Sequence, residues 1–160
     1  FDILKRKTAY LFSACCEIGA ILGGASKEHQ NALRDYGMNL GIAFQLADDS
    51  LDFTAEEEVL GKASGADLLE GKVTMPLLLL LQKEPSVRVD LEQIMHDGDY
   101  KNVPRESLLA KLEKHSAIEE TRQRAYNFAE KARKSLDVLG DSKYRLALEE
   151  IPTYMIERSK

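Results

Sequence analysis

The sequence has little of what marks several large classes of protein. Its two cysteines, Cys15 and Cys16, are adjacent, so they are poor partners for each other and provide no disulfide framework. We expect them to be small core residues of a protein in a reducing, cytoplasmic compartment. The longest apolar run, residues 73–81, is interrupted by Thr74 and Pro76 and is too short to cross a bilayer. This predicts no stable membrane insertion.

Histidine is also scarce, and acidic residues outnumber basic ones. The 160 residues carry a formal net charge of −5, which gives no electrostatic footprint for nucleic acid. The three histidines, His29, His96 and His115, are scattered and do not share a spacing typical of metal ligands. We expect them at surface or capping positions. The length allows one domain with a hydrophobic core.

Nearly every apolar pattern in the chain has the period of a helix, and no alternating strand pattern is convincing. The prediction is therefore an all-α fold, in a single domain that covers residues 1–160. Glycines at 61, 65 and 71 and mixed charge predict a loop over residues 54–71, with at most a short helical turn. The expected helices cover residues 1–22, 27–53, 74–83, 86–96, 104–115, 116–139 and 142–159.

The segment from Phe44 to Asp52 is the most informative part of the chain. Asp48, Asp49 and Asp52 follow one another within five positions of an otherwise apolar helical pattern. Residues four apart lie on one side of a helix, where like charges repel, and Asp is a poor residue for a helix interior. A cation would offset both costs, and Mg²⁺ binds one or two carboxylates together with water and phosphate oxygens. The alternative is a solvated acidic face.

Glycine and lysine follow the acidic segment. Gly61-Lys62 and Gly71-Lys72 lie on either side of Gly65, ahead of Pro76 and a run of leucines. Glycine lets a backbone approach a ligand closely, and lysine acts as a point charge for phosphate. Carboxylates with a metal on one wall and lysines on another predict a site for a diphosphate.

These motifs resemble those of the trans-type isoprenyl (polyprenyl) diphosphate synthases, most of all the medium- and long-chain, octaprenyl-type members. The likeness extends over essentially the whole chain and implies the C-terminal half of the isoprenoid synthase helical bundle. Residues 41–53 look like the second aspartate-rich motif of the family, and residues 60–62, 67–68 and 70–77 look like the segment that follows it. Lys5-Arg6-Lys7-Thr8-Ala9-Tyr10 resembles the family's Lys-Thr site.

One feature of the family is missing. Family members are about twice as long and carry a first DDxxD motif in their N-terminal half, whereas the only Asp-Asp pair here is Asp48-Asp49. We expect the 160 residues to be the C-terminal portion of a synthase and to be inactive alone.

The resemblance also implies an activity. It is the Mg²⁺-dependent transfer of a prenyl group, in which isopentenyl diphosphate and an allylic diphosphate give a longer polyprenyl diphosphate and pyrophosphate, usually in a homodimer. Asp48 is expected to be the principal metal ligand, with Asp49 and Asp52 as direct or water-mediated ligands. The other implied roles are diphosphate contact by Lys7 and Lys62, positions beside the reacting carbons for Thr8 and Gln45, a cavity lining of Tyr10 and Phe44, and a weaker diphosphate contact by Lys72.

Two other classes fit the same scaffold. A terpene-cyclase-like diphosphate enzyme would not incorporate isopentenyl diphosphate, so that assay separates it from a synthase. A non-catalytic helical subunit of a heteromeric synthase would have no need of Lys7, Gln45 or the three aspartates. Asp67 and Glu70 are expected to have structural roles.

Overall fold

The chain folds into helices joined by turns. The computed structural model describes residues 1–54 and 65–157, and no strand occurs in these two ranges. The all-α prediction is thus confirmed. Within the same ranges, no helix is both long enough and apolar enough to span a membrane. The chain divides into two compact units, Phe1–Ala47 with Gln123–Lys160, and Asp48–Arg122.

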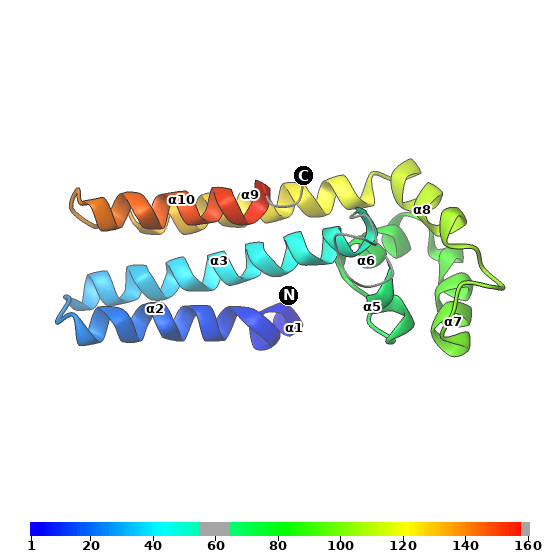
Figure 1. Cartoon of the computed structure of the whole chain (residues 1–160), viewed down its shortest axis with the longest axis horizontal. Helices are drawn as coiled ribbons and strands as arrows, with labels where there is room; N and C mark the ends of the chain where they lie inside the picture. The colour runs from blue at the N-terminus through cyan, green and yellow to red at the C-terminus, as the bar shows by residue number, and fades with distance from the viewer. Residues whose placement is uncertain (55–64, 158–160) are drawn as a thin grey trace. The chain divides into compact units, whose positions relative to one another are not determined.

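The first unit contains long helices that run alongside one another (Figure 1). Its chain begins with α1 (Asp2–Leu4), a π-helical turn η1 (Lys5–Ala9) and α2 (Tyr10–Leu22), which ends at the predicted residue and is capped by Gly23. The other helices are the first part of α3 (Lys27–Thr54), most of α9 (Ala117–Ser135) and α10 (Lys143–Glu157). The predicted start of α3 and its end near residue 53 are confirmed.

A cluster of apolar side chains holds these helices together. Its fully buried members come from α3 and from the end of α9, and Tyr36 also donates a hydrogen bond from its hydroxyl to the Leu148 carbonyl of α10, at 2.8 Å. Cys16 packs against the cluster, and burial raises the pKa of its thiol. Cys15 is exposed, so the expectation of two core cysteines holds for Cys16 only. The cluster consists of Tyr36, Leu40, Ala132 and Leu136, with Phe12, Cys16, Leu33, Leu139, Leu148 and Met155 packed against it.

Two glycines of α3 allow its backbone to lie against the preceding helical segment. A Cβ atom at Gly37 would lie 2.5 Å from the Phe12 carbonyl oxygen, and one at Gly41 would lie 2.5 Å from the Ala9 Cα. Both neighbours are backbone atoms, which cannot move aside as a flexible side chain can. Glycine at these positions therefore sets how closely the two helices pack.

The end of α9 differs from the prediction. The helix was expected to reach residue 139, but it ends at Ser135. Beyond it the chain tightens into i→i−3 hydrogen bonds, with Leu136 N donating to Arg133 O at 3.0 Å and Leu139 N to Leu136 O at 2.9 Å. The tighter turn carries Leu136 into the apolar cluster, and this long-range packing is not visible in the local pattern.

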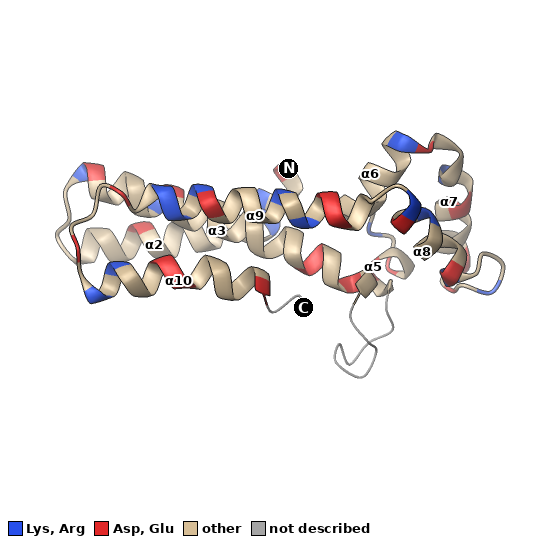
Figure 2. Cartoon of the chain, turned by 90° about the horizontal axis from the view of Figure 1, so that it is seen from above, with Lys and Arg blue, Asp and Glu red and all other residues tan. Residues whose placement is uncertain are grey.

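The last helix begins as predicted. The Ser142 Oγ accepts a hydrogen bond from the Arg145 backbone N–H at 3.1 Å, which is the N-cap interaction expected of serine. Pro152 lies inside α10. Figure 2 shows Lys and Arg interspersed with Asp and Glu along α9 and α10. Pairs such as Arg145–Glu149, at 2.8 Å, account for part of this mixture.

The second unit is built from shorter helices. It contains α5 (Ala66–Leu69), α6 (Met75–Lys83), a 3₁₀ turn η2 (Pro85–Val87), α7 (Arg88–Asp97) and α8 (Arg105–Lys114), with the end of α3 and the start of α9. Pro76 lies in the first turn of α6, where proline is tolerated. The core is made of leucine and isoleucine side chains, namely Leu77, Leu80, Leu91, Ile94, Leu108 and Leu112.

Ion pairs join the ends of these helices. His115 caps the C-terminus of α8, as expected of a capping histidine, and its Nε2 lies 2.7 Å from a carboxylate oxygen of Glu84. This hydrogen bond is the main reason why the pKa of Glu84 is lowered. The Lys83 ammonium donates to the His115 carbonyl and pairs with Glu120, each at 2.8 Å. Helices α6, α8 and α9 are thereby linked through charged groups at their ends.

The end of α7 predicts a dependence of stability on acid pH. Hydrogen bonds from Gln93, Asn102 and His96, in that order of effect, lower the pKa of Asp97 from 3.8 to about 2. Because the folded state favours the ionised carboxylate, its stabilising effect is complete above pH 3.8 and is lost as the pH falls to about 2. We expect the difference in melting temperature between the wild type and Asp97→Asn to shrink across this window. Circular dichroism melts at several pH values measure it, and a difference that stays constant from pH 6 to pH 2 would contradict the assignment.

Candidate functional site

The three aspartates near the C-terminal end of α3 lie in two different environments. Asp48 is exposed, whereas Asp49 and Asp52 are each only 2% exposed. The spacing had predicted only that Asp48 and Asp52 point the same way. Their exposure differs because Gly65 and Asp67 lie against Asp52. The backbone N–H of Gly65 donates to the Asp52 carbonyl at 2.6 Å, and that of Asp67 donates to the Asp52 Oδ2 at 3.3 Å.

Asp49 is held in a similar way by the beginning of α6. Its Oδ2 accepts a hydrogen bond from the Met75 backbone N–H at 3.2 Å. The first N–H groups of a helix have no partner inside the helix, and the positive end of the helix dipole favours a carboxylate there. Asp49 and Asp52 therefore have fixed orientations, and Asp48 is the exposed member of the three.

The three aspartates fit a Mg²⁺ ion that is bound partly by protein and partly by water and phosphate. In the part of the chain that the structure describes, no group of three or more Asp, Glu, His or Cys side chains is arranged to hold a metal ion by itself. Mg²⁺ does not require such a cage, since it retains several waters and binds proteins through one or two carboxylates plus substrate phosphate. The exposed carboxylate of Asp48 suits that arrangement, with Asp49 and Asp52 behind it.

Lys72 is engaged with carboxylates of its own unit. Its ammonium lies 3.3 Å from the Asp67 Oδ1 and also pairs with Glu70. Hydrogen bonds to Glu70 first and Asp67 second raise the pKa of Lys72. The pairs compensate much of the lysine charge, so Lys72 remains the weaker candidate for contact with a diphosphate. They also give Asp67 and Glu70 the structural role that was expected. Lys62 lies outside the described residues.

Thr8 and Gln45 are brought together directly, within the first unit. The Thr8 hydroxyl donates to the Gln45 Oε1 at 2.7 Å, and Gln45 is buried. Thr8 belongs to the π-helical turn η1, and Gln45 lies one turn beyond Gly41 on α3. The close approach of Gly41 to Ala9 thus brings Thr8 and Gln45 within hydrogen-bonding distance. Two polar groups fixed on one another in this way can present a defined dipole to a reacting group.

The remaining candidates of the first unit surround this pair in sequence. Lys7 is exposed on η1, where π-helical turns are often found at functional sites. Tyr10 is exposed, while Phe44 is half-buried and its ring centroid lies 5.7 Å from that of Phe12. Phe44 is therefore fixed by packing, whereas the position of the Tyr10 side chain is less constrained.

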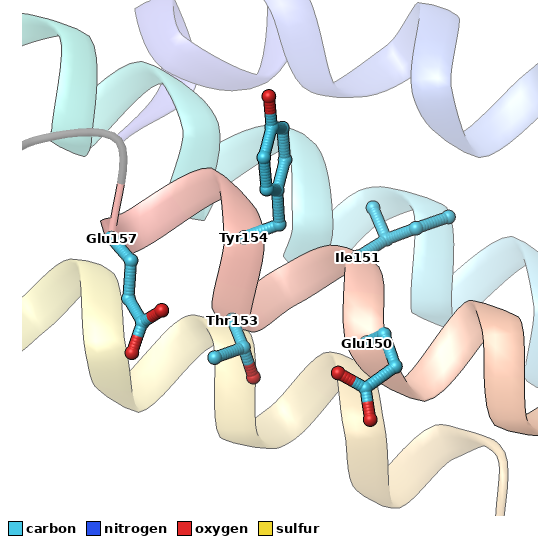
Figure 3. Close-up of a pocket in the computed structure, with 5 residues that line it drawn as sticks. All are labelled: Glu150, Ile151, Thr153, Tyr154 and Glu157. Carbon is cyan, nitrogen blue, oxygen red and sulfur yellow. The ribbon is translucent and has the colours of Figure 1, made fainter.

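A pocket of the first unit has a different character (Figure 3). It is lined by residues of α10, two of which are the carboxylates Glu150 and Glu157. Thr153, also in the lining, accepts a hydrogen bond from Arg133 at 2.5 Å. The lining residues include no cationic side chain and none of the predicted site residues. Two carboxylates would repel a diphosphate, so this pocket is not the predicted site.

Two residues of the aspartate environment, Gly65 and Tyr100, have no role that the sequence indicates. Gly65 and Tyr100 lie 35 positions apart, and the Tyr100 hydroxyl donates to the Gly65 carbonyl at 2.8 Å. Gly65 had been noted only as one glycine of a loop, although its φ of 80° is one that glycine adopts easily. No local pattern connects a tyrosine after α7 with that loop, so only the fold could reveal the contact.

Comparison with known proteins agrees with the motifs. A family model described as polyprenyl synthetase matches residues 1–112. The chain is 39% identical, over 157 residues, to geranylgeranyl diphosphate synthase of Methanosarcina mazei, covering 98% of this chain and 47% of that protein. It is 38% identical, over 163 residues, to octaprenyl diphosphate synthase of Escherichia coli, covering 99% of this chain and 49% of that protein.

Solved structures give the same result. The chain is similar to a decaprenyl diphosphate synthase from Rhodobacter capsulatus, with a TM-score of 0.87 and 37% identity over 99% of this chain and 49% of that one. The chain spans about half the length of the curated relatives it matches. The names of these relatives specify products of different lengths.

Proposed function

Because this chain belongs to the polyprenyl synthetase family, we propose that it provides part of the active site of a Mg²⁺-dependent prenyltransferase. The reaction joins an allylic diphosphate to isopentenyl diphosphate. The allylic carbon–oxygen bond breaks and pyrophosphate leaves with the bonding electrons. The double bond of isopentenyl diphosphate then forms the new carbon–carbon bond, and loss of a proton gives a polyprenyl diphosphate five carbons longer. The observation that carries the proposal is the exposed Asp48 beside two aspartates held by backbone N–H groups.

Asp48 is the residue that would hold the metal. When bound, Mg²⁺ supplies Lewis-acid stabilisation of the diphosphate leaving group. Asp48 would bind it through its exposed carboxylate. Asp49 and Asp52 would act directly or through water, and their hydrogen bonds to Met75 and Asp67 keep them oriented in either case. Pre-orientation of charged groups lowers the reorganisation that the reaction requires.

The basic and polar residues have complementary roles in this proposal. Lys7 and Lys62 contact the allylic diphosphate. Their positive charge stabilises the leaving group more strongly as it gains negative charge. Thr8 and Gln45 lie beside the reacting carbons, and their mutual hydrogen bond supports this role because it fixes the direction of the amide dipole. Phe44 and Tyr10 line the cavity and exclude water from the cationic intermediate.

The test is a product assay on the enzyme that contains this chain. Radiolabelled isopentenyl diphosphate is supplied with an allylic primer and Mg²⁺, and products are separated by chain length. We expect labelled prenyl diphosphates longer than the primer, and none after the metal is removed with a chelator. Consumption of the primer alone, with cyclic products and no label, would show a terpene cyclase instead. The same protein is expected to be a cytoplasmic homodimer, which light scattering and cell fractionation can check.

The Thr8–Gln45 hydrogen bond gives a more specific prediction. Thr8→Val keeps the shape of the side chain but removes the donor, so we expect kcat to fall by up to roughly tenfold, the factor that one lost hydrogen bond carries. Ser13→Ala is the matched control, because Ser13 also joins this segment to α3, donating to the Arg34 carbonyl at 2.9 Å. Both variants should lower the melting temperature to a similar extent, and only Thr8→Val should lower kcat. Equal kcat values for the two variants would remove Thr8 from the site.

A further inference from the structure

We propose that Tyr100 is a positioning residue for the aspartate motif, acting through the turn at Gly65 that holds Asp52. This inference rests on the proposed function of the aspartates. Every contact that it uses lies within the second unit, among Asp52, Gly65, Asp67 and Tyr100. Tyr100 follows α7 in the sequence and has no place in the motifs of the family that the chain displays.

Tyr100 is in direct contact with Gly65. The Tyr100 hydroxyl donates to the Gly65 carbonyl oxygen at 2.8 Å, and the tyrosine is half-buried. Burial, and then the nearby Asp52 charge, raise the pKa of Tyr100 to about 12, so the hydroxyl keeps its proton at neutral pH. A Cβ at Gly65 would collide with this hydroxyl. Tyrosine and glycine therefore fit one another closely.

The second step is the contact between the turn and Asp52. Two backbone N–H groups of the turn donate to Asp52. That of Gly65 donates to the Asp52 carbonyl at 2.6 Å, and that of Asp67 donates to the Asp52 Oδ2 at 3.3 Å. Gly65 reaches this position with φ = 80°, in the left-handed region. The orientation of the Asp52 carboxylate thus depends on the position of the turn, and Tyr100 fixes the turn through the Gly65 carbonyl.

The third step connects Asp52 with the metal ligand. Asp48 and Asp52 are four residues apart on α3, so their side chains leave the helix one turn apart. A change in the direction of the Asp52 carboxylate alters the field at Asp48, as well as any water that the two carboxylates share. Loss of the Tyr100 hydroxyl would therefore weaken metal binding, whereas a purely structural tyrosine would affect only the stability of the fold.

The experiment compares Tyr100→Phe with the wild type in the enzyme that contains this chain. The variant keeps the ring and loses the donor. We expect amide hydrogen exchange in peptides that cover residues 65–69 to become faster by roughly two- to tenfold, the factor of one neutral hydrogen bond. The Mg²⁺ concentration for half-maximal turnover should rise by a similar factor, while KM for both diphosphates at saturating Mg²⁺ stays unchanged. Tyr144→Phe, at an exposed tyrosine of α10, should change none of these values.

Several outcomes would overturn the inference. Unchanged exchange over residues 65–69 would show that the hydroxyl does not hold the turn. Faster exchange with an unchanged Mg²⁺ requirement would make Tyr100 a structural residue only. A wild-type enzyme without prenyl transfer would instead refute the proposed function, and the exchange experiment, which needs no turnover, would still decide whether Tyr100 holds the turn.

Discussion

Asp48→Ala is expected to reduce turnover by orders of magnitude and to leave the protein as stable as before, or more stable. If Asp48 holds the metal that draws charge from the leaving group, its loss removes stabilisation that operates mainly in the transition state, worth roughly 10²–10³ in kcat for one such group. The folded state loses little, because the side chain is exposed on α3. Alanine is also the better helix former, and the substitution removes a like charge one turn from Asp52.

Asp35→Ala is the matched control for this experiment. Asp35 is also an exposed aspartate of α3, so the substitution makes the same chemical change in the same helix. Turnover of Asp35→Ala should equal that of the wild type. The measurements are kcat with isopentenyl and allylic diphosphates, and a thermal melt. Near-normal turnover of Asp48→Ala would refute the assignment of the metal ligand, whatever the similarity to the family.

Gly41→Ala is expected to destabilise the fold, although alanine favours helices. The new Cβ would lie 2.5 Å from the Ala9 Cα, so α3 and the segment that precedes α2 would have to separate. Overpacking of this kind costs about 1–3 kcal/mol, against a gain of roughly 1 kcal/mol from helix propensity. Gly37→Ala is expected to behave in the same way, because its Cβ would meet the Phe12 carbonyl.

Gly19→Ala serves as the control for both glycine substitutions. Gly19 lies inside α2, and a Cβ there would have no neighbour within 4 Å. The melting temperature of Gly19→Ala should therefore rise, while those of Gly41→Ala and Gly37→Ala should fall by several degrees. A melting temperature of Gly41→Ala at or above the wild-type value would mean that the helices are not in close backbone contact.

The boundaries of the helices were predictable where a single residue type determines them. Gly23 ends α2, Pro76 lies in the first turn of α6, and Ser142 caps α10, each for a local reason that the sequence displays. The early end of α9 was not predictable, because it depends on the packing of Leu136 in a distant cluster. Ser116, which precedes α9, has a φ of 52°. It therefore lacks the extended backbone that is usual for an N-cap residue.

The candidate site shows the same division between local and distant causes. The acidic segment was recognisable because aspartate has a low helix propensity and because three neighbouring carboxylates in an apolar helix repel one another. The difference in burial between the exposed Asp48 and the buried Asp49 and Asp52 could not be predicted, because it depends on the backbone N–H groups of Asp67 and Met75. Those donors lie 15 and 26 residues away along the chain.

The π-helical turn η1 has a consequence for insertions and deletions. In an α-helix each residue adds about 100° of rotation, so removing one residue turns everything before it to a different face. In η1 the Tyr10 N–H donates to the Lys5 carbonyl, five residues back, and the turn contains one residue more than an α-helical turn would. A single deletion within Lys5–Ala9 can convert this turn to α-helix while α2 keeps its own register. We therefore expect a deletion of one residue to disturb the packing of α2 less here than at Phe12 or Ser13, which lie in α2 itself.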